Sequence, residues 1–225
     1  MTTRLGLAID LDRCIGCWAC AVACKIENSV GEGLWWQRIE TVGGAAPDSS
    51  TGRFPDVSKH YRPRNCFHCA EPPCLPACPE QAIGKRADGI VLIDPQRCTG
   101  CGDCVPACPY DAIALNAREP VFPPGLEDGT GSAAVAPRRA GIAEKCTLCV
   151  HRIDAGGVPA CAAACPTAAI AFGDLDDPDD SAGRLRRAQG AFRLNESSGA
   201  EPSQWYRPPV TALGQRRSGQ GTGAR

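Results

Sequence analysis

The sequence predicts an α+β chain that is rich in loops and carries four cysteine-bearing units. All sixteen cysteines of its 225 residues fall into four groups of four. Twenty prolines and twenty-five glycines interrupt the chain, while five phenylalanines, three tyrosines and one methionine supply little bulk for an apolar core. Short runs of branched apolar residues beside the cysteines favour short strands. A chain of this composition needs bound metal groups to supply part of its folding energy.

The four cysteine groups are called quartets below. Quartet one is Cys14, Cys17, Cys20 and Cys24; quartet two is Cys66, Cys69, Cys74 and Cys78; quartet three is Cys98, Cys101, Cys104 and Cys108; quartet four is Cys146, Cys149, Cys161 and Cys165. Quartets one and three follow C-x2-C-x2-C-x3-C, the run through which bacterial ferredoxins hold [4Fe-4S] clusters with thiolate sulfur. Quartet four is looser, because eleven residues separate its second and third cysteines.

Three elements are expected around the first three quartets. Small and branched apolar residues over residues 5–10 predict a strand before quartet one. The chain after Cys24 is expected to continue as a helix through residues 26–28. Residues 82–91 read as a β-hairpin whose turn is Ala87-Asp88-Gly89, because Asp-Gly is a strong signal for a tight turn.

Quartets two, three and four each lead into the same short sequence. Residues 78–83, 108–113 and 165–170 all read Cys-Pro, two variable residues, then Ala-Ile. The repetition predicts a cysteine loop that leads into a short strand. The proline has no N–H to donate and restrains the turn. Because quartet four shares this sequence, all four quartets are expected to bind metal.

The C-terminal part of the chain becomes polar, and we expect a tail over residues 176–225. Its final residues, 214–225, are rich in Gly, Arg and Gln and are expected to be disordered. Trp205 and Tyr206 stand out as aromatic residues with no local core, so they are candidates for an interface with a partner.

The quartets are expected to work in pairs, because in two-cluster ferredoxins the fourth cysteine of one run ligates the other run's cluster. Nineteen residues separate Cys78 from Cys98, which suits one compact unit. Longer gaps flank quartets two and three, so these two are expected to pair, leaving quartet one for quartet four. The predicted ligand sets are set one (Cys14, Cys17, Cys20, Cys165), set two (Cys66, Cys69, Cys74, Cys108), set three (Cys78, Cys98, Cys101, Cys104) and set four (Cys24, Cys146, Cys149, Cys161).

Structural zinc is the main alternative, since C-x2-C pairs also build zinc sites. Zinc ribbons, however, use two separated pairs and not four thiolates within eleven residues. A disulfide framework is the other alternative, but sixteen cysteines in a chain without a secretory signal near its N-terminus favour metal ligation.

Charge and motif content exclude several function classes. Twenty-four Lys and Arg against twenty-five Asp and Glu give a formal net charge of −1, so no basic excess indicates nucleic-acid binding. No apolar run is long enough to cross a membrane. Three scattered histidines and the lack of a nucleotide loop or flavin fingerprint leave no candidate catalytic residues. Electron transfer without catalysis is the expected role.

The order of the quartets, with the segments at residues 146–154 and 172–178, resembles the four-cluster iron–sulfur subunit of dimethyl sulfoxide reductase-type molybdoenzymes. The resemblance covers about residues 5–178. It implies two pseudo-symmetric ferredoxin-like halves with two [4Fe-4S] clusters each, four in total. It also implies a large catalytic partner with molybdopterin-guanine-dinucleotide and an integral-membrane, quinone-reactive subunit. In such complexes the first-quartet cluster lies toward the catalytic subunit and the third-quartet cluster toward the membrane.

On this basis we expect single electrons to pass between the molybdopterin subunit and the quinone-reactive subunit or a soluble carrier. The expected halves are residues 1–30 with 141–175, and residues 60–116; residues 31–59 and 117–140 are insertions, and residues 176–225 are a partly docking, partly disordered tail. Assembly is expected in the cytoplasm, with the complex on the cytoplasmic face of a membrane or exported on a partner's signal. A free-standing polyferredoxin and a hydrogenase-linked subunit remain alternatives.

Overall fold

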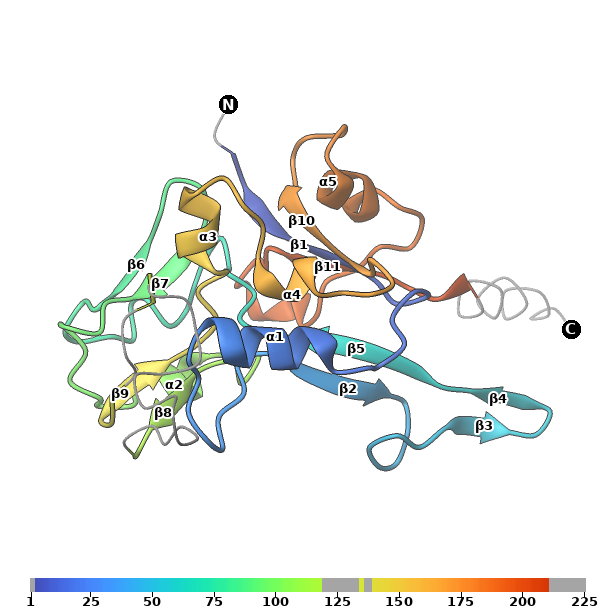
Figure 1. The fold of residues 1–225 in the computed structure, drawn as a ribbon, viewed down its shortest axis with the longest axis horizontal. Helices are drawn as coiled ribbons and strands as arrows, with labels where there is room; N and C mark the ends of the chain where they lie inside the picture. The colour runs from blue at the N-terminus through green and yellow to red at the C-terminus, as the bar shows by residue number, and fades with distance from the viewer. Residues whose placement is uncertain (1–2, 119–133, 136–138, 211–225) are drawn as a thin grey trace, which may run out of the picture.

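The computed structural model describes residues 3–118, 134–135 and 139–210. Short strands and helices are joined by long loops in this part of the chain (Figure 1). The expected disorder of residues 214–225 and most of the expected insertion at 117–140 lie outside the described residues. The architecture is mixed α+β with several small sheets, as the sequence predicts.

The largest sheet has the strand order β10-β1-β11. β1 (Leu5–Asp10) forms the expected N-terminal strand, and it lies antiparallel to β10 (Ile170–Asp174) and parallel to β11 (Gln204–Arg207). α5 (Ser181–Arg186) packs against all three strands. The sheet therefore joins the N-terminus, the end of quartet four and the C-terminal segment.

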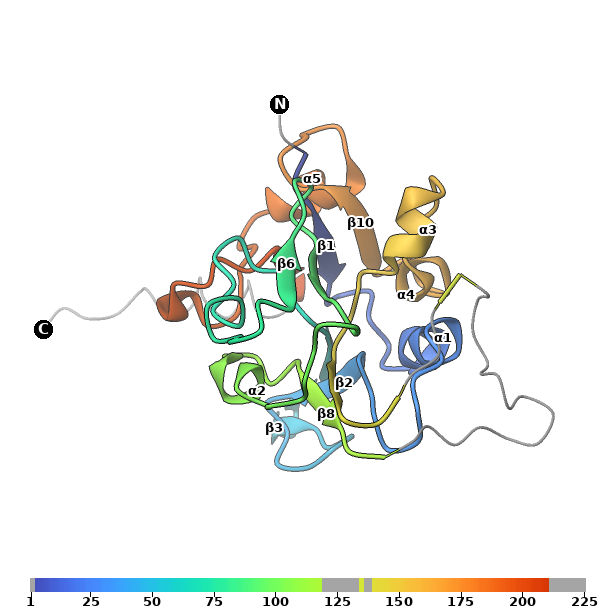
Figure 2. The ribbon, with the colours of Figure 1, turned by 90° about the vertical axis from the view of Figure 1, so that its left-hand side faces the viewer.

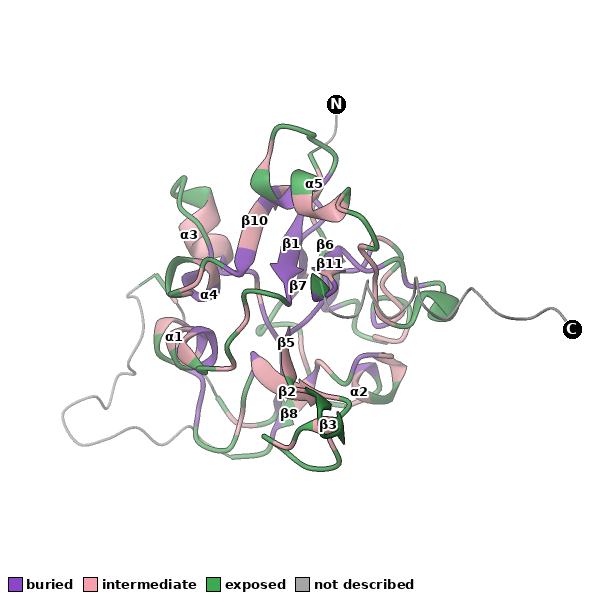
Figure 3. Cartoon of the chain, turned by 90° about the vertical axis from the view of Figure 1, so that its right-hand side faces the viewer, coloured by how far each residue is buried: buried purple, intermediate pink, exposed green. Residues whose placement is uncertain are grey.

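Both faces of β1 are buried (Figure 3). Leu7 and Ile9 pack in the main hydrophobic cluster, while Ala8 packs on the opposite face with Leu175 and Ala182. A strand with two buried faces reads as a continuous apolar run. This explains why residues 5–10 lack a clear polar alternation.

Three of the helices lie together at one side of the molecule. α1 (Ala19–Glu27) contacts α4 (Ala160–Ala163), and α3 (Val150–Asp154) lies beside them (Figure 2). Glu27 joins α1 to α3, because its carboxylate accepts from His151 Nε2 at 2.7 Å and Arg152 Nη1 at 2.9 Å. The expected helix after Cys24 is thus the second half of α1, which ends at Glu27 with Asn28 as its cap.

Two small hairpins and one short helix surround quartets two and three. β6 (Ile83–Lys85) pairs with β7 (Val91–Ile93), as the sequence predicts. β8 (Ala114–Asn116) pairs with β9 (Ile142–Glu144), and α2 (Cys104–Ala107) lies close by.

The pairing of β8 with β9 joins two residue ranges that were expected to belong to different halves. β9 belongs with quartets two and three, because Ala143 packs in one hydrophobic cluster with Cys74, Cys104 and Ile113. Its pairing with β8 spans the insertion. Because β8 and β9 are far apart in the sequence, no local pattern of residues could predict that they pair.

The segment expected to be an insertion before residue 60 forms a long ribbon. β2 (Arg38–Val42) pairs with β5 (His60–Arg64), and β3 (Thr51–Arg53) pairs with β4 (Asp56–Ser58). Figure 1 shows β3 and β4 projecting away from the rest of the molecule. The ribbon packs closely against the loop of quartet one. A Cβ added at Gly16, in that loop, would lie 2.5 Å from the ring of Tyr61 in β5.

The interface role expected for Trp205 and Tyr206 is wrong. After a short 3-10 helix (Glu196–Ser198), the chain re-enters the core as β11. Tyr206 is fully buried, and its hydroxyl donates to the carbonyl of Pro63 at 2.9 Å. Trp205 is half-buried and lies under two guanidinium groups, those of Arg186 and Arg193. Tyr206 is buried against β1 and β5, while Trp205 packs with Ala8 of β1 and Ala182 of α5, all far away in the sequence.

Gly100, in the loop of quartet three, is expected to tolerate no side chain. Its φ is +73°, and a Cβ there would lie 1.9 Å from the carbonyl oxygen of Gly141. Gly102 supplies a matched control, since its φ is +85° but no atom lies within 4 Å of a Cβ placed there. Gly102→Ala should cost only the left-handed backbone term, about 1–2 kcal/mol. We expect Gly100→Ala to lower the melting temperature of the iron-loaded protein clearly more; equal losses would contradict the close contact.

Candidate metal centres

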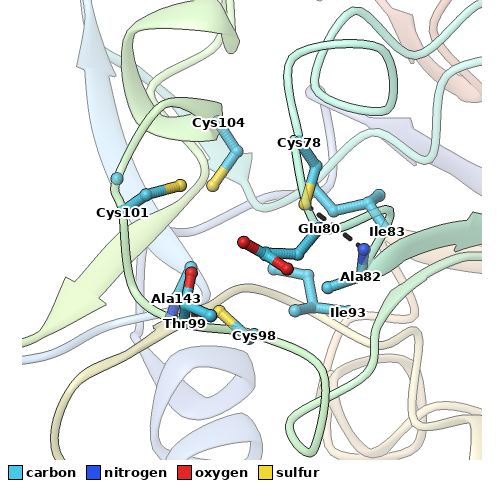
Figure 4. Close-up of a pocket in the computed structure, with 11 residues that line it drawn as sticks. Cys78, Glu80, Ala82, Ile83, Ile93, Cys98, Thr99, Cys101, Cys104 and Ala143 are labelled. Carbon is cyan, nitrogen blue, oxygen red and sulfur yellow. Dashed lines mark hydrogen bonds between the residues drawn. The ribbon is translucent and has the colours of Figure 1, made fainter.

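The four thiols of set three face one cavity. Cys98, Cys101 and Cys104 come from quartet three, and Cys78 from the end of quartet two (Figure 4). The cavity has a volume of about 320 Å³, including space open to solvent. The loop that holds Cys98 and Cys101 turns through the two positive-φ glycines described above, and Cys104 begins α2.

Sets one and two are arranged in the same way. Cys14, Cys17, Cys20 and Cys165 line a cavity of about 310 Å³, and Cys66, Cys69, Cys74 and Cys108 line one of about 320 Å³. In each cavity three thiols come from one quartet and the fourth from the other quartet of the predicted pair.

Set four is the most deeply buried. The exposed fractions of Cys24, Cys146, Cys149 and Cys161 are 5%, 6%, 4% and 5%. Burial, followed by the nearby sulfurs of Cys146, Cys161 and Cys149, raises the pKa of Cys24 well above its ordinary value. The contact between α1 and α4 brings Cys24 toward Cys161.

Burial makes bare thiolates unfavourable at these sites. It is the largest cause that raises the pKa of Cys20 to about 12, of Cys74 to about 12 and of Cys104 to about 11, and neighbouring thiols add to it. A bound cation reverses this balance, since coordination favours the deprotonated thiol. The sets are therefore suited to a strongly cationic group such as iron.

The partly exposed Cys165 differs from the buried thiols. Burial acts to raise its pKa, but the Thr167 hydroxyl and the backbone N–H of Ala169 donate to the sulfur and leave the pKa below its ordinary value. Its thiol therefore loses a proton more readily than an ordinary cysteine does.

The donor sets fit iron–sulfur clusters better than single ions. In the described part of the chain, no three Cys, His, Asp or Glu side chains lie close enough to share one metal ion. The sulfurs instead surround cavities, which a multi-iron group can fill. Glu80 also points into the cavity of set three (Figure 4). A cluster there requires the Glu80 side chain to turn outward, and its exposed position permits this.

The repeated Cys-Pro sequence has a structural explanation. In each copy the alanine four residues after the cysteine donates its N–H to that cysteine's sulfur: Ala82 to Cys78 at 3.3 Å, Ala112 to Cys108 at 3.5 Å and Ala169 to Cys165 at 3.2 Å. The residue before each alanine, Gln81, Asp111 or Ala168, has a φ of 49°. The repeat is therefore a tight turn that directs one amide at one sulfur.

Two asparagines that sequence reasoning missed also contact sulfur. Asn28 Nδ2 lies 3.6 Å from Cys149 Sγ, and Asn65 Nδ2 lies 3.3 Å from Cys146 Sγ. Asn28 could have been found, since it follows Cys24 by one helical turn. Asn65 could not, because its sulfur partner is 81 residues away in the sequence.

Neighbouring cysteines connect the four sets. Cys20 of set one lies in one hydrophobic cluster with Cys161 of set four and Cys69 of set two, and it interacts electrostatically with Cys24 and Cys161 of set four. Cys146 of set four packs with Cys66 of set two. Cys74 of set two packs with Cys104 of set three. The sets thus follow one another as one, four, two and three.

Cavities lined by four cysteines and connected through the core define a ferredoxin-type protein that binds [4Fe-4S] clusters. In agreement, the sequence profile described as a 4Fe-4S dicluster domain matches residues 57–122 and 133–175.

Curated relatives identify the family. A protein of Halobacterium salinarum described as a dimethyl sulfoxide reductase iron–sulfur subunit is 42% identical over 210 residues, 91% of this chain and 79% of the relative. The arsenate respiratory reductase iron–sulfur subunit of Shewanella sp. (strain ANA-3) is 36% identical, and the match covers 90% of this chain and 95% of the relative. A tetrathionate reductase subunit of Salmonella typhimurium is 37% identical and covers 90% and 72%.

The chain belongs to the family of iron–sulfur subunits of dimethyl sulfoxide reductase-type molybdoenzymes. It is an electron-transfer subunit of a molybdopterin oxidoreductase complex and is not itself catalytic. The predicted family and role are thereby confirmed. No helix in the described residues is long and apolar enough to cross a membrane.

Proposed function

We propose that the chain binds four [4Fe-4S] clusters, one in each ligand set, and relays single electrons through them. One partner is a large catalytic subunit with molybdopterin-guanine-dinucleotide, and the other is a quinone-reactive membrane subunit or a soluble carrier. The observation that carries the proposal is the crossing of ligands: in each of three cavities, the fourth thiol belongs to the paired quartet. When bound, each cluster supplies a site that accepts and releases one electron.

The order of the sets supports a linear relay. Sets four and two lie in the middle, and every cysteine of set four is buried. Sets one and three lie at the ends, and each has one exposed ligand, Cys17 and Cys101 respectively. A relay needs buried intermediate centres and terminal centres close to the surface. The exposure of the ligands follows this pattern.

The surface beside set one supports its assignment to the catalytic partner. Ile15, Trp18, Val22, Ile26 and Trp35 are all large apolar residues with exposed fractions between 40% and 59%. Val22 and Ile26 lie four residues apart on one face of α1, and Trp18 is the N-terminal cap residue of the same helix. Exposed apolar side chains gathered beside an exposed ligand suit a protein–protein interface. We assign this face to the large subunit and the surface around Cys101 to the quinone-reactive partner.

The two ferredoxin-like halves belong to the same proposal. One comprises residues 1–30 and 141–175 with sets one and four, and the other comprises residues 60–116 with sets two and three. β9 completes the second half, and β11 from the tail completes the first. Such a complex would work at a membrane, on the cytoplasmic face or after export with its partner.

Anaerobic co-purification with metal analysis tests the proposed function. We expect a large molybdenum-containing subunit to co-purify and the chain to carry about sixteen iron atoms with equal acid-labile sulfide. A nickel-containing partner would instead indicate a hydrogenase-linked subunit, and an active monomer that serves many enzymes would indicate a polyferredoxin. Zinc without iron or sulfide would overturn the cluster assignment altogether.

A further inference from the structure

Set four differs from the other sets in how its sulfurs are hydrogen bonded. The sulfurs of Cys78 and Cys98 in set three and Cys108 in set two accept from backbone N–H groups. Cys165 in set one also accepts from the Thr167 hydroxyl. Set four has a backbone donor too, Leu148 N–H to Cys146 at 3.3 Å. In addition, two side-chain carboxamides, from Asn28 and Asn65, are directed at its sulfurs.

The orientation of the Asn28 amide is fixed by its surroundings. The residue is 1% exposed, and its Nδ2 donates to the carbonyl oxygen of Cys24 at 3.0 Å. A carbonyl can only accept, so the NH2 end of the amide must face it. The same nitrogen lies 3.8 Å from the Cys24 sulfur and 3.6 Å from the Cys149 sulfur. One buried NH2 group thus lies between two ligands of set four.

Asn65 lies where sets two and four meet. It precedes Cys66 of set two in the sequence, is 4% exposed, and donates from Nδ2 to Cys146 Sγ of set four at 3.3 Å. Cys66 and Cys146 pack in one buried cluster. A donor on this boundary acts on the centre through which electrons cross between the two halves.

Burial and these amides act in opposite directions on set four. Reduction adds a negative charge to a cluster that is already anionic, and a buried site penalises that charge. Hydrogen bonds to the sulfurs stabilise the added charge and raise the reduction potential. Because all four of its ligands are buried, set four carries the larger penalty, and it also has the two side-chain donors.

We propose that Asn28 and Asn65 are positioning residues that raise the reduction potential of the set four centre and keep it accessible between sets one and two. The inference depends on the proposed function, because it assumes a redox-active cluster in set four. Removing one amide should favour the oxidised cluster by about tenfold, which for one electron is about 59 mV toward lower potential.

A redox titration of the iron-loaded protein, followed by electron paramagnetic resonance, tests this proposal. Asn28→Leu and Asn65→Leu remove the donors at nearly constant size. Asn116→Leu is the matched control, since Asn116 is 5% exposed and its Nδ2 donates to Arg139 O at 3.0 Å and Glu144 Oε1 at 3.2 Å, not to sulfur. We expect the first two variants to lower the potential of one and the same centre, and the control to leave all potentials in place.

The wild-type protein provides a second readout that does not depend on the folding of the variants. After labelling asparagine with nitrogen-15, pulsed resonance spectra of the reduced set four centre should show coupling to the label. Unchanged potentials in folded Asn28→Leu and Asn65→Leu would overturn the inference, as would the absence of that coupling. Fewer than four clusters in the wild type would instead overturn the proposed function, so the two failures can be distinguished.

Discussion

Replacing Cys165 with serine is expected to destroy the centre of set one and to spare that of set four. Cys165 lies in quartet four, but its side chain lines the cavity with Cys14, Cys17 and Cys20. Serine cannot replace a thiolate whose pKa the Thr167 hydroxyl and the backbone amides already lower. Electron transfer to a catalytic partner at set one should fall by more than about tenfold. Resonance spectra of the reduced variant should lack one of four signals.

Cys161→Ser is the matched control for this experiment. Cys161 lies four residues earlier, in α4, and its thiol belongs to the buried set with Cys24, Cys146 and Cys149. It should remove a different signal from the one that Cys165→Ser removes. If both variants lost the same signal, quartet four would hold its own cluster and the crossed ligation would be refuted.

Much of the fold follows from local sequence signals. The strand at residues 5–10 and the hairpin at 82–91 are encoded by short apolar runs and a tight turn, and both form. The Cys-Pro repeat is also local, because its N–H to sulfur bond joins residues four apart. The ligand sets stay a prediction, supported by the way the cavities group the thiols.

Other features depend on contacts between distant segments. β9 pairs with β8 across the insertion, and β11 inserts beside β1 at the opposite end of the chain. Tyr206 lies in a polar stretch of sequence, yet its side chain is buried in the core and its hydroxyl donates to the carbonyl of Pro63. No periodicity within a short window can reveal such partners, because the surfaces that bury these residues are assembled only in the folded chain.

Removing iron is expected to be the most destabilising change. Most of the cysteines pack in the three hydrophobic clusters of the core. Without the iron–sulfur groups, the core would be left with cavities lined by apolar atoms and thiols. Metal binding contributes directly to folding in such chains. We expect chelation under anaerobic, reducing conditions to lower the melting temperature by about 20 °C or more, measured by circular dichroism.

The iron-free chain should also lose stability as pH rises. Burial raises the pKa of Cys20, Cys74 and Cys146 from 9.0 to about 12. Above pH 9 the unfolded chain therefore binds fewer protons than the folded chain, so the free energy of unfolding decreases with pH. The contribution of these thiols to the free energy of unfolding is fully present below about pH 9 and is lost progressively toward pH 12. Cys165, whose pKa is lowered, acts in the opposite direction, but only below about pH 9, where the unfolded thiol still holds its proton.

The loaded protein provides the comparison that ties this pH dependence to the ligand thiols. Its thiolates are already coordinated, so they have no proton to lose in the same interval. Its melting temperature should change far less than that of the iron-free chain between about pH 8 and pH 10. Equal slopes for the two forms would mean that other groups cause the alkaline loss. The buried thiols would then not need a cation to stay ionised in the folded chain.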